Sequence, residues 1–171
     1  MWPLCLAFVD IALHRRGPQH LPASEFLLGL VLAVYLVIGL AALQFGSTLS
    51  RAVSLLLFDT AVYLVAIWAV LKLFRRPRRF LQTATAFVGT DAFLNTVALP
   101  LIFWDESLQA PPDQLTTPRL LFLLLLIWHV DIGGYILSKA VEKPYIVGVS
   151  IVIVYVLTSM QLRETLFPPI G

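Results

Sequence analysis

The sequence predicts an all-α fold, a polytopic membrane helix bundle with five transmembrane helices and an N-terminal interfacial helix. Of its 171 residues, 59% are hydrophobic and 13% are charged. The apolar residues gather in stretches near or above the length of about 20 residues that crosses a hydrocarbon core. No linker is long enough to separate a second domain. We therefore expect one membrane domain over residues 25–171, preceded by a cytoplasmic segment of residues 1–24.

The N-terminal segment carries a short apolar stretch followed by basic residues. As a helix, residues 2–13 would rise only about 18 Å, which is too short to span a membrane. A secretory signal would place positive charge before its apolar core, whereas Arg15 and Arg16 follow it. We expect a helix in the membrane interface, anchored by Trp2 and Phe8, with the arginines facing head groups. A ragged N-terminus is the alternative.

Five predicted spans follow, at residues 25–45, 50–74, 80–104, 120–138 and 144–162. Proline marks several of their beginnings, with Pro22 before the first span, Pro118 before the fourth and Pro144 at the start of the fifth. A tight turn over residues 46–48 joins the first two spans. Residues 105–119 form the only loop with room for irregular structure.

The basic residues predict the orientation of these spans, because they concentrate on the cytoplasmic side of short loops. With the N-terminus inside, nine lie on the cytoplasmic side and three outside, which together make the 12 Lys and Arg of the chain. The outer three are Arg51, Arg119 and Arg163. We expect a cytoplasmic N-terminus and an external C-terminus. The short loops favour a bacterial inner membrane, with a eukaryotic endomembrane as the alternative.

Three aspartates, Asp59, Asp91 and Asp131, lie in three different spans. Counting along the helices places them roughly 14 to 18 Å deep, near the middle of the bilayer. An ionised aspartate at that depth costs about 2.5 to 3.5 kcal/mol, so these side chains are expected to face protein or water. No Lys or Arg is expected at that depth. Hydroxyls, amides, water, His129 or a shared proton must then supply their partners.

Polar residues at helical spacing accompany the aspartates. Tyr63 follows Asp59 by four residues and Asn95 follows Asp91 by four, which places each pair on one helix face. His129 lies two residues from Asp131 and points to another side of the helix, although it could contact a neighbouring helix. The predicted intramembrane polar cluster consists of Asp59, Asp91, Asp131, Asn95, Tyr63 and His129. It fits interhelical hydrogen bonding, a proton or ion path, or a binding cavity.

A second predicted site is a cytoplasmic basic cluster formed by Arg75, Arg76, Arg78 and Arg79. Arginines just outside a span attract anionic lipids, and each contributes about 1 kcal/mol of attraction free energy near the membrane surface. An acidic cytoplasmic partner is the alternative. The net charge of +2 is no indication of nucleic-acid binding.

The sequence predicts no enzyme, cofactor or metal site. Nucleophile-elbow, zinc-protease and phosphate-loop motifs are missing, and the single cysteine, Cys5, excludes an internal disulfide and a four-cysteine site. An intramembrane aspartyl protease is a remote alternative, because Asp59 and Asp91 lie in consecutive spans. Thr90 stands where such proteases have a glycine directly before the second aspartate.

Two stretches of the predicted spans carry a family pattern: Phe80-Leu-Gln-Thr-Ala-Thr-Ala-Phe followed by Ala98-Leu-Pro100-Leu, and Leu126-Ile-Trp128 leading to Ser138-Lys-Ala140. They resemble the Yip family of multi-span proteins related to Rab-interacting Yip proteins. The resemblance covers roughly residues 25–162 and includes the five closely spaced spans. It implies a membrane-embedded adaptor or organiser without catalytic residues. Asp91 has no counterpart in the family pattern.

The sequence therefore predicts a non-enzymatic membrane organiser, adaptor or subunit of a membrane complex. Such a protein would have a protein partner or a second copy of itself in the membrane. The alternative is a small transporter or proton-conducting subunit that uses the midplane aspartates. The two differ in one physical requirement, because only a transporter needs a water-accessible path to the aspartates.

Overall fold

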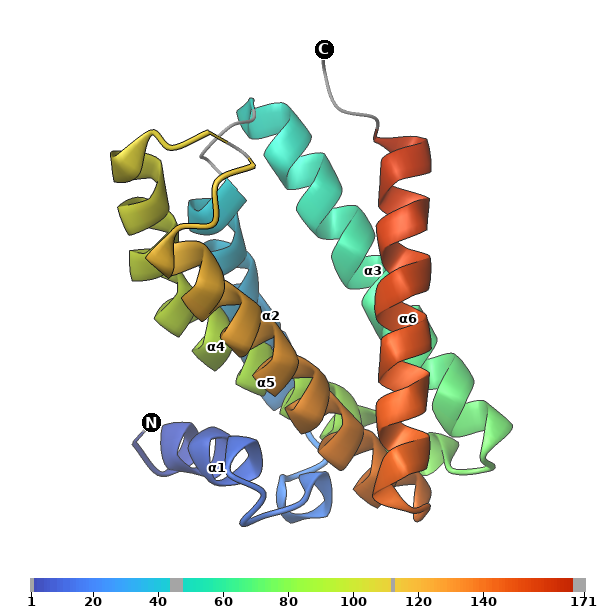
Figure 1. Cartoon of the computed structure of the whole chain (residues 1–171). Helices are drawn as coiled ribbons and strands as arrows, with labels where there is room; N and C mark the ends of the chain where they lie inside the picture. Colours follow the sequence, from blue (N-terminus) through green and yellow to red (C-terminus); the bar gives the residue numbers. More distant parts are fainter. Residues whose placement is uncertain (1, 44–47, 112, 168–171) are drawn as a thin grey trace.

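The computed structural model describes residues 2–43, 48–111 and 113–167. These residues form six α-helices and two 3-10 turns (Figure 1). The elements are α1 (Trp2–Ala12), η1 (Pro18–His20), α2 (Glu25–Leu43), α3 (Leu49–Leu73), η2 (Pro77–Arg79), α4 (Phe80–Leu108), α5 (Thr117–Val141) and α6 (Tyr145–Leu166). In this part of the chain, five helices, α2 to α6, are long and apolar enough to cross a membrane. The helical class and the five long apolar segments are confirmed.

The helix ends differ from the predicted spans mainly around the loop between α4 and α5. α4 continues past Pro100 to Leu108, and α5 begins at Thr117, so the expected loop is shorter at both ends. Ending a helix early would leave further backbone groups without partners, which is costly in an apolar environment. The predicted turn between α2 and α3 falls largely on residues 46 and 47, which lie outside the described residues.

α4 is the central helix of the bundle. It packs against α2 and α5, and α5 in turn packs against α6. Residues 83–92 of α4 are all buried, and most of them are small. The hydroxyls of Thr85 and Thr90 donate to backbone carbonyls one turn earlier, so these buried groups need no partner from another helix. Because these side chains are small, and because the threonine hydroxyls bond within their own helix, neighbouring helices can approach α4 closely.

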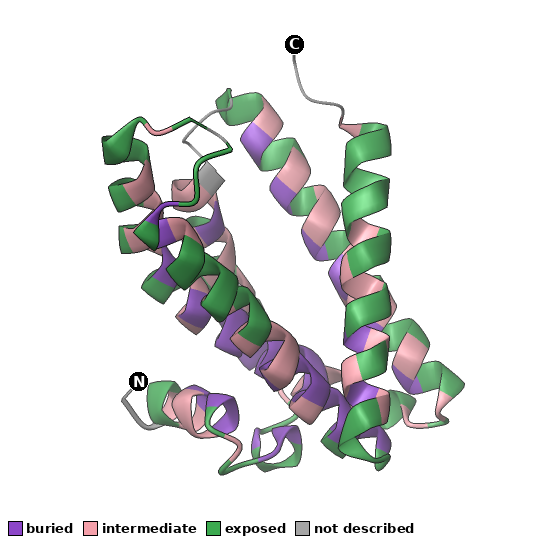
Figure 2. Cartoon of the chain, viewed as in Figure 1, coloured by how far each residue is buried: buried purple, intermediate pink, exposed green. Residues whose placement is uncertain are grey.

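The bundle has two ends of different character. In Figure 1 the α3–α4 and α5–α6 connections meet at the bottom, and from there α3 and α6 diverge from α2, α4 and α5. Figure 2 shows that buried residues gather in the lower half, whereas α6 is mostly exposed above its base. We call the lower end, which carries Arg75, Arg76, Arg78 and Arg79, the basic end, and the other the far end.

A backbone contact between two glycines fixes α6 against α5. A Cβ atom added at Gly148 would overlap the carbonyl oxygen of Gly134 and lie 2.9 Å from the backbone nitrogen of Ser138. Both obstacles are backbone atoms, which cannot rotate away. The two helices therefore approach as closely as they do only because position 148 has no side chain.

The N-terminal helix is present as α1, but its phenylalanine does not serve as the expected membrane anchor. Phe8 is buried against Gly89 of α4, where a Cβ atom would overlap the aromatic ring. The indole nitrogen of Trp128 donates to the carbonyl oxygen of Ala12 over 3.4 Å. The missing side chain at Gly89 provides the space for Phe8, so α1 packs on the bundle. The Trp2 side chain lies outside the described part of the structure.

Half of the basic cluster is bound within the protein, in contrast to its expected exposure to lipid. Arg76 and Arg79 both form ion pairs with the carboxylate of Glu142, which ends α5. Arg79 also donates to the carbonyl oxygens of Lys139 and Ala140, at 3.2 and 3.0 Å. The C-terminal carbonyls of a helix carry partial negative charge, which explains the attraction. Arg75 and Arg78 remain exposed.

Candidate functional site

One polar side chain from each long helix lies at a common level in the bundle. Measured along each helix from the basic end, these five residues lie about 15 to 18 Å away, close to half the thickness of a hydrocarbon core. They are Tyr35 of α2, Tyr63 of α3, Asp91 of α4, His129 of α5 and Tyr155 of α6. We call this set the polar layer.

Asp91 and His129 form the titratable centre of the polar layer. The Nδ1 atom of His129 lies 3.2 Å from Oδ1 of Asp91. The Asp91 side chain is 9% exposed and the His129 side chain 32% exposed, so the carboxyl lies deeper than the imidazole. α4 holds Asp91 in its fully buried stretch, and α5 crosses beside it. A carboxylate and an imidazole at this distance can share and exchange one proton.

Tyr63 contributes a buried hydroxyl group beside this pair. The hydroxyl makes no hydrogen bond within the described part of the chain. Its ring stacks on Tyr155, with centroids 5.5 Å apart, and meets the ring of Phe87 edge-on at 5.7 Å. These ring contacts fix the direction in which the hydroxyl points.

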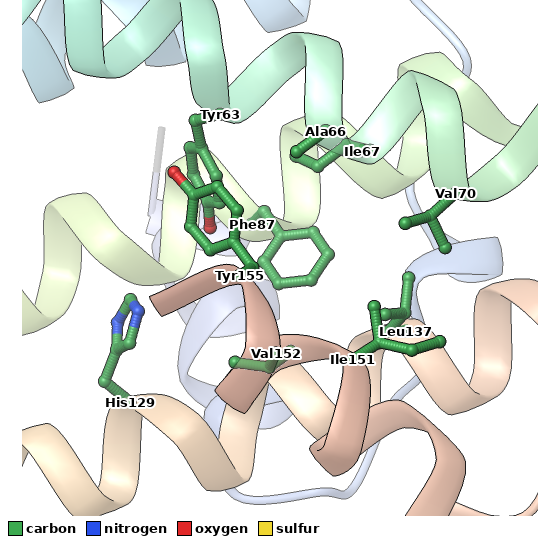
Figure 3. Close-up of a pocket in the computed structure, with 10 residues that line it drawn as sticks. All are labelled: Tyr63, Ala66, Ile67, Val70, Phe87, His129, Leu137, Ile151, Val152 and Tyr155. Carbon is green, nitrogen blue, oxygen red and sulfur yellow. The ribbon is translucent and has the colours of Figure 1, made fainter. Parts of the chain in front are cut away.

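A small cavity adjoins Tyr63 and His129 (Figure 3). Its volume is about 40 Å³, whereas a single water molecule needs about 10 to 15 Å³ on this measure. Tyr155 and His129 line it together with Tyr63, and apolar side chains such as Ile67 and Val152 form the remaining wall. The cavity has room for water but not for an organic substrate, which typically occupies about 300 to 1,000 Å³.

Asp59 has a partner that the sequence reasoning excluded. Its carboxylate forms an ion pair with the guanidinium of Arg163 in α6. The expectation that no Lys or Arg reaches the depth of the aspartates was wrong at this position. A long arginine side chain extends its charge several ångströms beyond its own backbone, and α6 runs beside α3.

Asp131 lies on a different side of α5, facing α1 and the start of α6. Its carboxylate accepts a hydrogen bond from the hydroxyl of Tyr145 and lies 3.2 Å from Nε2 of His14. The His14 ring stacks on Tyr135, with centroids 4.2 Å apart. Asp131 therefore binds the end of α1 to the α5–α6 hairpin and is separate from the polar layer.

The structure divides the predicted intramembrane cluster among four places. Asp91, His129 and Tyr63 lie together, whereas Asp59 and Asp131 each have partners of their own. Asn95 is half-buried one turn further along α4 and makes no hydrogen bond to the Asp91–His129 pair. Asp59 and Asp91 contact different partners, Arg163 and His129, and the aspartyl-protease alternative stays a prediction.

The sequence analysis missed several residues that the structure brings into these sites, namely His14, Tyr35, Tyr145, Tyr155 and Arg163. For two of them a signal was present. Tyr35 and Tyr155 each lie ten residues from the start of their helix, at the same depth as the aspartates. Counting tyrosines as well as carboxylates would have placed both in the layer.

Comparison of the chain with protein-family models, curated proteins and solved structures finds no match. Within the described residues, no group of three or more His, Cys, Asp and Glu side chains could hold a metal ion. The resemblance to the Yip family stays a prediction. The functional proposal therefore rests on the chemistry of the polar layer.

Proposed function

We propose that this protein is an integral membrane protein that binds and moves protons, as a small transporter or proton-conducting subunit. The observation that carries this proposal is the Asp91–His129 pair, held in a layer to which each of the five long helices contributes a polar side chain. Titratable side chains are costly inside a membrane and commonly mark ion or proton pathways. Hydrogen bonding alone could be achieved with neutral side chains such as Asn and Gln.

The charge of the pair supports proton uptake. With a neutral imidazole and an ionised carboxyl, Asp91 and His129 together carry one negative charge. One added proton makes the pair neutral overall, and a low-dielectric interior favours the neutral state. Tyrosine hydroxyls both donate and accept hydrogen bonds, so Tyr63 and Tyr155 can pass a proton to or from water. The small cavity is consistent with a proton as the transported species.

Proton flux through proteoliposomes tests this function. We expect a potassium diffusion potential to drive proton entry into vesicles that contain the wild-type protein, measured with an enclosed pH-sensitive dye. Asp91→Asn should slow this flux about 100-fold or more, in the range expected when a positioned acid–base group is lost. The amide keeps the shape of the carboxyl, and a histidine without a carboxylate partner is mostly neutral at pH 7, so no charge is left uncompensated and we expect the variant to fold like the wild type.

Asp131→Asn is the matched control for that experiment. It makes the same chemical change in a spanning helix, but on the face of α5 that contacts α1. We expect its flux to stay near the wild-type rate. Equal flux in the wild type and in Asp91→Asn would contradict the proposal.

The orientation of the chain is a separate prediction. We expect a reporter inserted after Arg79 to lie in the cytoplasm and one fused to the C-terminus to lie outside, because basic residues stay on the cytoplasmic side. Arg75 and Arg78, the exposed half of the basic cluster, would then face anionic lipids of a bacterial inner membrane. Paired alkaline phosphatase and fluorescent-protein fusions measure both positions. Two cytoplasmic reporters would contradict this topology.

A membrane organiser remains the second candidate, and one observation favours it. α6 is buried only at Gly148 and Val152, so most of its apolar surface faces outward. In a membrane, such a surface meets lipid or a helix of another protein. A partner that co-purifies equally with the wild type and with Asp91→Asn would support this role.

A further inference from the structure

We infer that water and protons reach the polar layer from the far end only, between α3 and α6. This inference rests on the proposed function, and it concerns the route to the site. We call the route the α3–α6 seam and define it by Asp59 and Tyr63 on α3 and by Tyr155, Ser159 and Arg163 on α6. Three observations support it: the facing polar stripes, the apolar packing below them, and the Tyr63 hydroxyl beside the cavity.

The residues of the seam form two polar stripes that face each other. Tyr155, Ser159 and Arg163 recur at a spacing of four and therefore share one face of α6. Asp59 and Tyr63 have the same spacing on α3. The Asp59–Arg163 ion pair joins the stripes towards the far end, and the stacked rings of Tyr63 and Tyr155 join them at the polar layer. Polar groups of α3 and α6 thus recur along the seam from the far end to the polar layer.

The same helices become apolar on the other side of the layer. Towards the basic end, Ile67 of α3 and Val152 of α6 form the apolar wall of the cavity, and beyond the cavity Leu71 of α3 is 0% exposed. Leu137 of α5 packs with them and is 3% exposed. A chain of water molecules would find no hydrogen-bonding side chain among these residues. The route is therefore closed towards the basic end.

The Tyr63 hydroxyl indicates where water is bound on this route. A buried hydroxyl without a hydrogen-bonding partner is unfavourable, and the hydroxyl points towards the cavity shared with Tyr155 and His129. A water molecule in that cavity would accept or donate a hydrogen bond to Tyr63. This water would take a proton from the seam and release one to the Asp91–His129 pair, so that water is unchanged and the pair gains one proton.

Cysteine accessibility tests the route, and the chain suits the method because Cys5 is its only cysteine. In a Cys5→Ser background, Ser159→Cys places a thiol in the seam, Leu157→Cys places one on the outward face of α6 at nearly the same depth, and Leu71→Cys places one on α3 between the cavity and the basic end. A membrane-impermeant cationic methanethiosulfonate is added to each side of oriented vesicles. Modification is followed by mass shift.

We expect Ser159→Cys to react from the far-end side at least 10-fold faster than Leu157→Cys, because a thiol forms its reactive thiolate only where water reaches it. Leu71→Cys, at a position that is 0% exposed, should react from neither side and should be modified fully after denaturation. Equal rates for Ser159→Cys and Leu157→Cys, or reaction of Leu71→Cys from the basic end, would overturn the inference.

The flux experiment separates this inference from the proposed function. If Ser159→Cys is accessible but Asp91→Asn leaves a wild-type proton flux, the route stands and the proton-transport function fails. If Asp91→Asn abolishes flux but Ser159→Cys is no more reactive than Leu157→Cys, the function stands and protons reach the layer by another path.

Discussion

Gly148→Ala is expected to destabilise the protein by about 3 kcal/mol, the upper part of the usual range for added volume in a packed core. The new methyl group would overlap the carbonyl oxygen of Gly134 and crowd the backbone nitrogen of Ser138. Relief requires α6 to move away from α5, and that movement also separates Val152 from the core. Thermal unfolding in mild detergent, followed by circular dichroism, measures the change.

Gly29→Ala is the matched control for this substitution. It adds the same methyl group to another of the five long apolar helices, but nothing lies within 4 Å of the new Cβ atom. Alanine favours helix over glycine by up to about 1 kcal/mol, so this variant should be as stable as the wild type or slightly more stable. Similar losses in the two variants would show that the close contact of α5 and α6 does not account for the effect.

Such close contacts show what the sequence could and could not predict about the fold. The lengths of the apolar stretches predicted the five long helices, because hydrophobic thickness constrains length directly. Which helices become neighbours depends on how well the shapes of their surfaces fit, and the periodicity of the sequence does not predict that fit. The contact between Phe8 and Gly89 is one example. In the sequence, Gly89 looks like an ordinary small residue of a helix and Phe8 looks like an ordinary membrane anchor, so neither residue alone predicts the contact.

The candidate site was predictable in depth but not in pairing. Counting residues placed Asp91 and the segment around His129 at a similar level, and the helical period showed that His129 and Asp131 point apart. The sequence analysis left open a contact between His129 and another helix, but it could not identify Asp91 as the partner. That pairing depends on how α5 is rotated against α4. The Asp59–Arg163 pair was missed for a different reason, because depth was counted at backbone positions and the reach of the side chain was left out.

The pairing of Asp91 with His129 has a consequence for stability as well as for proton transfer. In the folded protein, the contact between the two side chains offsets the unfavourable free energy of burying each of them. Removing one partner from a buried ion pair commonly costs about 3 to 5 kcal/mol, because the other charge is left without compensation. Removing both charges together commonly costs much less.

We therefore expect His129→Leu to lose about 3 to 5 kcal/mol of stability at neutral pH, as is usual for an uncompensated buried charge. Asp91 would remain 7% exposed, surrounded by the buried stretch of α4. Acidification should restore part of the loss, since a protonated carboxyl carries no charge. The measurement is chemical unfolding in detergent across a range of pH values, with the wild type alongside.

The double variant Asp91→Asn with His129→Leu completes this test. It should recover most of the stability lost by His129→Leu and should show little additional dependence on pH, because no uncompensated charge remains. The two substitutions should then be strongly non-additive, as expected for residues in direct contact. Additive losses would mean that Asp91 and His129 contribute independently to the packing of α4 and α5. The proposed proton-binding role of the polar layer would then lose the energetic coupling between these two side chains on which it rests.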